Sequence, residues 1–283
     1  MEDRRIEWVS SKWLMDNLDE ELKIIDCQPN VHDYVRRHIP GAAYLAEENL
    51  RIMQDSIPHR WLEGQMAAKI FSQLGLSNDI PVVVYTSIKP AVPTGDGVPQ
   101  SMIAYSLVRY GHKKVLILDG GLDEWLKNGG QTTQTLPKIK KGDFRPMIDT
   151  SLPMTYVEFI SRKDGEDVIH IDSRSGEQYE GESVWSKKGH IPGSINIPWS
   201  SSFQPHNLAL LRPKEEIIEI FSQSRVVPEK EIICHCGTGR KAAAQLVVLR
   251  WLLGYPRVRL FEGSFTEWCR YEENETVIGF RPR

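Results

Sequence analysis

A cysteine stands where a short apolar run gives way to a glycine-containing loop. Cys236 follows the run 232–234, and Gly237 and Gly239 precede a second stretch, 242–253, that is rich in strong helix formers. These patterns predict a short buried strand and then a helix. The two glycines allow the loop to curl so that its N–H groups converge, and the N-terminus of the helix points the same way. We therefore expect an anion-binding loop with a thiol at its start.

Cys236 is the candidate nucleophile of this loop. Converging N–H dipoles, the helix N-terminus and the adjacent cations Arg240 and Lys241 all favour a thiolate over a thiol, and the thiolate is the nucleophilic form. A buried structural role is the commoner fate of a free cysteine. That alternative suits Cys234, but at Cys236 it leaves the two glycines and the neighbouring charges unexplained.

Length and charge narrow the class of protein. A chain of 283 residues exceeds a typical domain, so two domains of about 130 to 150 residues are expected. The net charge of −3 is spread along the sequence, which argues against nucleic acid or a membrane surface as partner and favours a small molecule. Four cysteines do not make a disulfide framework, the first residues lack the apolar core of a signal peptide, and no run reaches transmembrane length. A cytoplasmic location is the expectation.

The chain contains an internal repeat. Four segments recur in the same order at offsets between 143 and 152 residues, namely 24–26 with 169–172, 38–42 with 190–194, 82–86 with 232–236, and 111–125 with 254–268. Offsets that drift so little indicate a duplication. We expect a first copy over 1–130, a linker rich in Gly, Thr, Lys and Pro over 131–153, and a second copy over 154–283.

Short apolar runs alternate with helical patterns inside each copy. In the first copy the predicted strands are Lys23–Asp26, Val82–Tyr85 and Val115–Leu118, and the predicted helices are Ser10–Asn17, Met66–Leu74 and Ser101–Tyr110. This order predicts an α/β fold in which each copy forms a parallel sheet flanked by helices on both faces. Such sheets bind ligands at the carboxyl ends of their strands, where Cys236 is expected.

Taken together, the motifs resemble the rhodanese superfamily, and the duplication resembles its two-domain sulfurtransferases. The motifs are a strand ending in Asp, then His-Ile-Pro-Gly, then Cys with a six-residue loop opening a helix, then Gly-x-x-x-Val-x-x-x-x-Gly-x-x-x-x-Trp, and they cover residues 8–268. The resemblance implies transfer of sulfur from a small anionic donor, thiosulfate or 3-mercaptopyruvate, through a cysteine persulfide to cyanide or a thiol acceptor. It implies no metal and no organic cofactor.

The resemblance also assigns residues to the site. Cys236 is the expected persulfide carrier; the expected substrate-binding residues of its loop are Gly237, Thr238, Gly239, Arg240 and Lys241. Asp172 and Arg174 match the family's Asp-x-Arg and are expected to orient the site.

A substrate-binding arginine of the family falls on Gln178, and the insertion that carries a second arginine is shortened to 182–188. Lys187 and Lys188 are candidates to replace the lost charge, although two exposed lysines more often mark a solvated loop. Because the carboxylate clamp for mercaptopyruvate has lost its arginine, thiosulfate is the favoured donor. 3-Mercaptopyruvate is the alternative, which the sequence Cys-Gly-Thr-Gly supports.

The first copy is expected to be inactive. Thr86 stands where Cys236 stands in the second copy, and a hydroxyl has no thiolate form that could carry a persulfide. The segment 87–100 is also longer than the six-residue loop. Cys27 and Cys269 are interpreted as structural, and Trp125 and Trp268 as core anchors at matching positions of the repeat.

Two other function classes remain. A cysteine phosphatase or arsenate reductase needs an arginine after five further residues, where this chain has Ala242. A non-catalytic sulfur-sensing or interaction module is compatible with the fold, because a fold does not fix a function. The intact Cys-Gly-Thr-Gly loop favours the enzyme.

Overall fold

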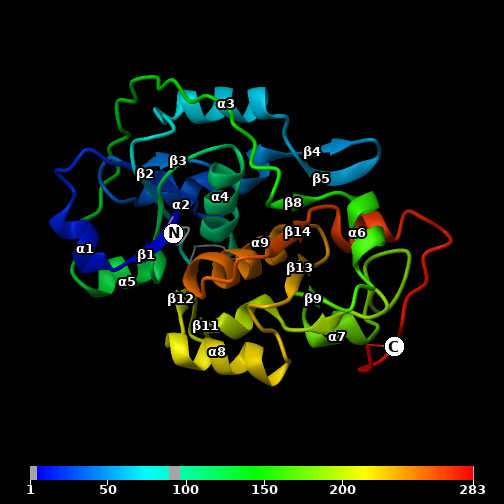
Figure 1. The fold of residues 1–283 in the computed structure, drawn as a ribbon. Helices are drawn as coiled ribbons and strands as arrows, with labels where there is room; N and C mark the ends of the chain where they lie inside the picture. The colour runs from blue at the N-terminus through cyan, green and yellow to red at the C-terminus, as the bar shows by residue number, and fades with distance from the viewer. Residues whose placement is uncertain (1–4, 89–95, 283) are drawn as a thin grey trace. The chain divides into compact units, whose positions relative to one another are not determined.

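A computed structural model describes residues 5–88 and 96–282 of the chain. It divides into two compact units (Figure 1). The first unit comprises Met1–Leu50, Leu62–Asp149 and Phe203–Arg212, and the second comprises Arg51–Trp61, Thr150–Ser202 and Pro213–Arg283. Each unit therefore includes one short segment from the other copy of the repeat.

The first unit is built on a five-stranded parallel sheet. Its order is β1 (Ile6–Val9), β7 (Val115–Leu118), β6 (Val82–Tyr85), β2 (Lys23–Asp26) and β3 (Ala43–Tyr44). Helix α4 (Val98–Arg109) packs on β6 and β7. The other face carries α1 (Ser11–Asp16) and α5 (Gly121–Lys127), whose apolar side chains join alternate residues of the same strands. The predicted α/β architecture is confirmed here.

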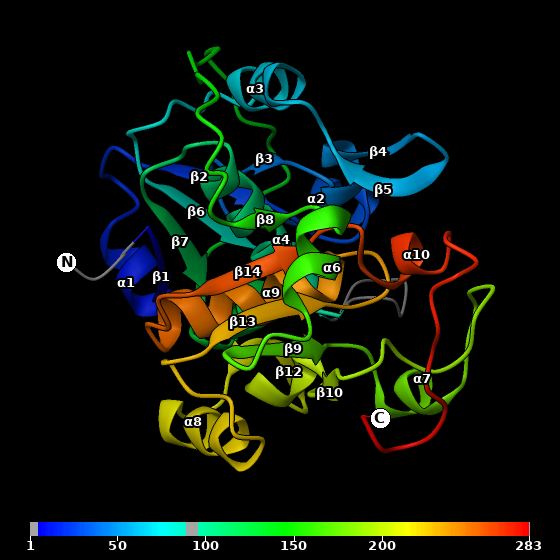
Figure 2. The same cartoon turned by 45° about the vertical axis from the view of Figure 1, so that its right-hand side comes forward.

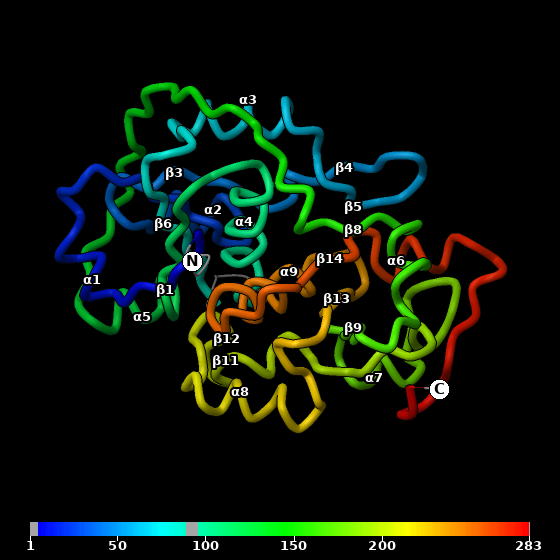
Figure 3. Tube along the Cα trace, in the orientation of Figure 1, coloured from blue at the N-terminus to red at the C-terminus, as the bar shows by residue number. Residues whose placement is uncertain are grey.

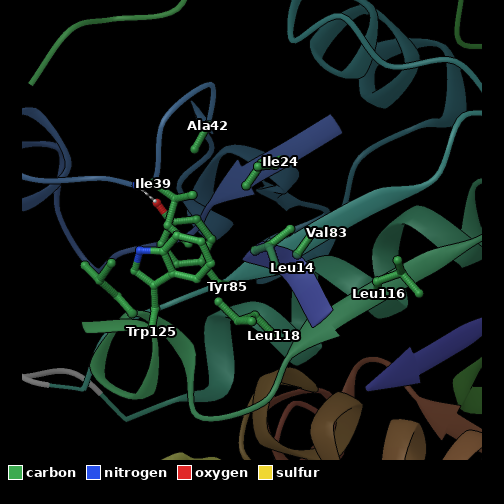
Figure 4. Close-up of a cluster of buried hydrophobic side chains, with 10 residues drawn as sticks. Leu14, Ile24, Ile39, Ala42, Val83, Tyr85, Leu116, Leu118 and Trp125 are labelled. Atoms are coloured by element: carbon green, nitrogen blue, oxygen red, sulfur yellow. Dashed lines mark hydrogen bonds between the residues drawn. The ribbon is translucent and has the colours of Figure 1, made fainter. Parts of the chain in front are cut away.

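Trp125 anchors the core on the face covered by α1 and α5. It is fully buried among side chains from β2, β6 and β7, with Tyr85 and Leu118 close to it in Figure 4. Its Nε1 donates a hydrogen bond of 2.9 Å to the carbonyl of Gln131. Trp268 occupies the matching place in the second unit and donates in the same way to Glu275, at 3.0 Å. The prediction of two core anchors is confirmed.

The second unit repeats the same plan. Its five-stranded parallel sheet has the order β10 (Ile195–Asn196), β9 (Val168–Asp172), β13 (Glu231–His235), β14 (Val258–Phe261) and β8 (Pro153–Met154). Helices α6 (Tyr156–Arg162) and α10 (Ser264–Trp268) supply the core on one face, and α9 (Arg240–Val247) packs on the other. Helix α8 (Lys214–Gln223) lies beyond, against the 3-10 turn η2 (Trp199–Ser202).

The histidine of each His-Ile-Pro-Gly motif fastens a turn. His190 lies between two carbonyls, with Nδ1 2.9 Å from Tyr179 O and Nε2 3.1 Å from Arg281 O. Its ring stacks on Tyr179 at 3.6 Å between centroids. His38 makes the corresponding contacts in the first unit. These histidines are therefore structural.

The remaining elements lie outside the two five-stranded sheets. They are α2 (Val31–Arg36), η1 (Glu47–Leu50), β4 (Arg51–Gln54), β5 (Ile57–Trp61), α3 (Gly64–Gln73), α7 (Gly176–Glu180), β11 (Phe203–Gln204) and β12 (Asn207–Leu211). After α5, the segment 129–149 runs as an extended chain past α3 (Figure 3), held by a hydrogen bond of 2.8 Å from Gly142 N to Ser72 O. Among the described residues, no helix is both long and apolar enough to cross a membrane.

Candidate functional site

The loop 236–239 lies between the carboxyl end of β13 and the first residue of α9. Cys236 follows the strand directly and is 1% exposed, so its thiol lies at the base of the loop. Gly239 is the N-cap of α9, with a φ of 79° in the left-handed region that favours glycine. The helix begins at Arg240, two residues before the predicted start, and its last turns, Val248–Leu252, are π-helical.

The carbonyl groups of the first three loop residues all point to partners outside the loop. Two of the partners belong to α10, and the third is a guanidinium on β4. The hydrogen bonds run from Phe265 N to Cys236 O (2.9 Å), from Thr266 N and Oγ1 to Gly237 O (2.9 and 2.8 Å), and from Arg51 Nη1 to Thr238 O (3.1 Å).

The hydrogen bonds to these three carbonyls decide where the N–H groups of the loop point. The described chain has no cis peptide bond, and in a planar trans peptide the C=O of one residue and the N–H of the next point in opposite directions. The N–H groups of Gly237, Thr238 and Gly239 therefore face away from the partners of these carbonyls on α10 and β4. Converging N–H groups at a helix N-terminus favour an anion.

Two indole rings explain why both loop positions are glycine. A Cβ on Gly237 would lie 2.3 Å from Cζ2 of Trp185, and a Cβ on Gly239 would lie 2.9 Å from the ring of Trp61 and 2.7 Å from the carbonyl of Glu262. Any side chain at either position would displace a ring or the backbone. Trp185 is itself held by a hydrogen bond of 2.9 Å from its Nε1 to Oγ1 of Thr266.

Asp172 and Arg174 form a buried ion pair beneath Trp185. Nη2 of Arg174 donates to Oδ2 of Asp172 at 2.6 Å, Nε lies 3.0 Å from both carboxylate oxygens, and Nη2 also reaches Gly189 O at 2.8 Å. The guanidinium lies 5.2 Å from the centroid of Trp185 and 4.0 Å from that of Phe265. The pair thus supports the side chain that packs on Gly237.

The charge state of Asp172 follows from these neighbours. Burial alone raises the pKa of Asp172, but the positive charge of Arg174 and the hydrogen bonds from it outweigh this effect and hold the pKa below its usual value. Burial lowers the pKa of His235 to about 4, so at neutral pH this histidine is uncharged and Arg174 is the stabilising cation. His235 packs against Phe159 of α6.

Gln178 and the shortened insertion form a separate pocket. Its volume is about 480 Å³, and it is lined by Gln178, Gly181, Glu182, Ser183, Val184 and Lys188, with no residue of the loop 236–241 among them. Lys188 is exposed. The idea that Lys187 replaces the lost arginine is wrong, because its ammonium donates to the carbonyls of Tyr271, Glu272 and Asn274. It fastens the segment that follows α10.

The other three cysteines lie in less reactive surroundings. Burial raises the pKa of Cys234, which is fully buried, and that of Cys27, which is 1% exposed. Burial also raises the pKa of Cys269, which is partly exposed at the end of α10. A raised pKa disfavours the thiolate, in agreement with a structural role for all three.

The first copy carries a different arrangement at the matching strand end. Thr86 is fully buried, its hydroxyl donates to Cys27 O at 3.1 Å, and its N–H donates to Oε1 of Gln100 at 3.2 Å. Nε2 of Gln100 and the N–H of Gly120 both donate to Ala209 O on strand β12, at 3.1 and 3.0 Å. These hydrogen-bond donors at the strand end therefore all have acceptors within the first unit. Of the predicted long loop 87–100, residues 89–95 lie outside the described residues.

Several residues at the loop were not identified from the sequence. Ser264 Oγ accepts a hydrogen bond of 3.1 Å from the N–H of Cys236. Thr266 and Trp185 contact Gly237. Arg51 and Trp61 contact the loop from a hairpin about 180 residues upstream. In the repeat, Ser264 aligns with Gly121 and Thr266 with Asp123, so both differ between the two copies. That difference is a signal that could have found them, whereas no local pattern marks Arg51.

The chain is similar to known proteins over most of its length. The family model described as Rhodanese-like domain matches residues 10–128 and 155–271. Thiosulfate/3-mercaptopyruvate sulfurtransferase 1, mitochondrial, from Arabidopsis thaliana is 30% identical over 296 residues, covering 92% of this chain and 75% of that protein. Sulfur carrier protein TtuD from Thermus thermophilus is 28% identical over 277 residues, covering 92% of each. The solved structure of an anaerobic ergothioneine biosynthesis enzyme from Chlorobium limicola has the same fold, with a TM-score of 0.84, 22% identity, and coverage of 96% of this chain and 70% of that one.

Proposed function

Because the chain belongs to the rhodanese family of tandem-domain sulfurtransferases, we propose that it transfers sulfane sulfur from thiosulfate to cyanide or a thiol acceptor through a persulfide on Cys236. One observation carries the proposal. Cys236 lies at the base of a loop whose first three carbonyls are all bonded to outside partners, so that the following N–H groups face the side where an anion would bind.

The proposed reaction has two steps, each with no net oxidation or reduction. The Cys236 thiolate attacks the outer sulfur of thiosulfate, a new S–S bond forms, the S–S bond of thiosulfate breaks, and sulfite leaves with the electron pair. Cyanide or a thiolate then attacks the outer sulfur of the persulfide. The Cys236–sulfur bond breaks, the thiolate of Cys236 is restored, and thiocyanate or a new persulfide leaves.

The loop suits both steps because each moves negative charge within it. The N–H groups of Gly237, Thr238 and Gly239 can stabilise the thiolate, the persulfide and the departing sulfite without reorganising, which is the main way in which a preorganised site lowers a barrier. Arg240 and Lys241 add positive charge in the first turn of α9.

Thiosulfate is the proposed donor, and 3-mercaptopyruvate is the alternative. Thiosulfate is a compact dianion that the loop could hold by itself, whereas mercaptopyruvate needs a partner for its carboxylate. Gln178 is neutral, it lines a pocket that contains no loop residue, and Lys187 is engaged with main-chain carbonyls. These observations support thiosulfate. The printed name of the Arabidopsis relative includes both donors.

We also propose that the catalytic part is the second copy, 154–283, completed by the hairpin β4–β5. In the first copy, over 1–130, Thr86 cannot form a thiolate.

Steady-state turnover with each donor tests the proposal. Thiocyanate formation from thiosulfate and cyanide, and pyruvate release from 3-mercaptopyruvate, are measured on the same preparation. We expect a kcat/KM at least about tenfold higher for thiosulfate, in keeping with one lost charge-assisted hydrogen bond to the carboxylate. Cys236→Ser should abolish both activities, and Cys269→Ser should retain them. A tenfold preference for mercaptopyruvate would replace the proposed donor, and no turnover with either would favour a non-catalytic module.

A further inference from the structure

The hairpin of β4 and β5 belongs to the second unit although its sequence lies in the first copy. It is fastened beside α10, which Figure 2 shows next to β5. The side chain of Arg60 pairs with Glu267 of α10, and Arg270 donates to the carbonyl of Asp55 at the tip of the hairpin. The hairpin is thus held on the same element that holds the loop carbonyls of Cys236 and Gly237.

Two side chains of this hairpin reach the loop itself. Trp61 fills the space where Gly239 lacks a Cβ, and Nη1 of Arg51 donates to Thr238 O at 3.1 Å. The Arg51 guanidinium also lies 5.7 Å from the centroid of Trp61, so the ring limits its orientation. Arg51 is partly buried in this position.

The hydrogen bond from Arg51 to Thr238 O also determines the direction of the N–H group in the peptide between Thr238 and Gly239. Because Thr238 O is held toward Arg51, the N–H of Gly239 points away from Arg51, in the opposite direction to that carbonyl. Gly239 has a positive φ and no side chain, so its backbone is less restricted than that of a residue with a Cβ. Phe265 and Thr266 hold the two preceding peptides, and Arg51 is the corresponding partner of this one.

We propose that Arg51 is a positioning residue for anions at the Cys236 loop: it fixes the N–H of Gly239 toward the bound anion and brings a positive charge to the loop in a chain where a substrate-binding arginine of the family falls on Gln178. The inference rests on the proposed function, in which that anion is the sulfur donor. It assigns to the first copy a specific contribution to the site of the second.

Alkylation of Cys236 tests this without requiring sulfur transfer. The rates of modification by iodoacetate, an anion, and by iodoacetamide, its neutral analogue, are measured at Cys236 by peptide mass spectrometry. We expect Arg51→Met to lower the iodoacetate-to-iodoacetamide ratio about tenfold, and Arg51→Lys, which keeps the charge and a donor, to restore most of it. Arg270→Met, which loosens the same hairpin without touching the loop, is the matched control and should leave the ratio unchanged.

Loss of stability alone would change both rates together. An unchanged ratio in Arg51→Met, or an equal fall in Arg270→Met, would overturn the inference. Turnover provides a second readout, because kcat/KM for thiosulfate should fall about tenfold in Arg51→Met and recover in Arg51→Lys. If the wild-type chain turns over neither donor, the proposed function fails, while the alkylation ratio still decides the role of Arg51.

Discussion

In each copy, the equivalent strand ends with a buried aspartate. The partners of the two aspartates predict that replacing them with Asn changes stability with opposite dependence on pH. Asp172 is paired with Arg174, whereas Asp26 accepts hydrogen bonds from the neutral groups of Gln28 and Tyr85. Burial raises the pKa of Asp26 to about 6, although these hydrogen bonds oppose the rise, while the pKa of Asp172 is held below its usual value.

Replacing Asp172 with Asn should destabilise the second unit strongly. It leaves the guanidinium of Arg174, which is 1% exposed, without its carboxylate. Breaking a buried ion pair costs about 3–5 kcal/mol, which corresponds to about 2 to 3.5 orders of magnitude in amide exchange rates. Native-state hydrogen exchange of peptides from β9 and β13 would measure this. Because the folded-state pKa of Asp172 is lowered, its contribution is present above a pH of about 4 and is lost as the pH falls below that.

Asp26→Asn is the matched variant in the first unit, and its pH dependence has the opposite sign. A folded-state pKa raised to about 6 contributes stability at low pH that is lost as the pH rises through 6. Relative to wild type, Asp26→Asn should therefore gain about 2 kcal/mol between pH 4.5 and 7.5, read from exchange in β6 after correction for intrinsic rates. Unchanged protection of β13 in Asp172→Asn, or a relative loss for Asp26→Asn over this pH range, would refute the assignment of charge at these strand ends.

Other substitutions test the loop and the donor. Gly237→Ala places a Cβ 2.3 Å from the ring of Trp185, so kcat for sulfite release from thiosulfate should fall at least about tenfold. Gln178→Arg should raise kcat/KM for 3-mercaptopyruvate more than for thiosulfate, by about tenfold, in parallel steady-state assays. Thr86→Ala should leave turnover within about threefold by the same assays, since Thr86 lies in the first unit.

The sheets were predictable because their strands are short apolar runs that alternate with helical patterns along the chain. The predicted strands Lys23–Asp26, Val82–Tyr85 and Val115–Leu118 coincide with β2, β6 and β7. Helix α9 starts earlier than predicted, because Arg240 and Lys241 interrupt the apolar pattern although Gly239 already caps the helix. The sequence pattern reports burial, and Arg240 and Lys241 in the first turn are only partly buried.

The sequence patterns within each copy do not predict that the hairpin β4–β5 joins the second unit and that the hairpin β11–β12 joins the first. Trp61 and Arg51 lie about 180 residues from the loop that they contact, and nothing in their local sequence indicates which unit the hairpin joins. Lys187 was misjudged for a similar reason, since its three carbonyl partners belong to the segment after α10. Long-range contacts of this kind are set by tertiary packing and not by local periodicity.

Mass spectrometry after incubation with thiosulfate tests the central claim most directly. The intact protein should gain one sulfur atom, peptide mapping should place it on Cys236, and cyanide or dithiothreitol should remove it. Cys236→Ser should gain none. The account would be contradicted if the sulfur mapped to Cys27, Cys234 or Cys269, or if Cys236→Ser acquired it as readily as the wild-type chain.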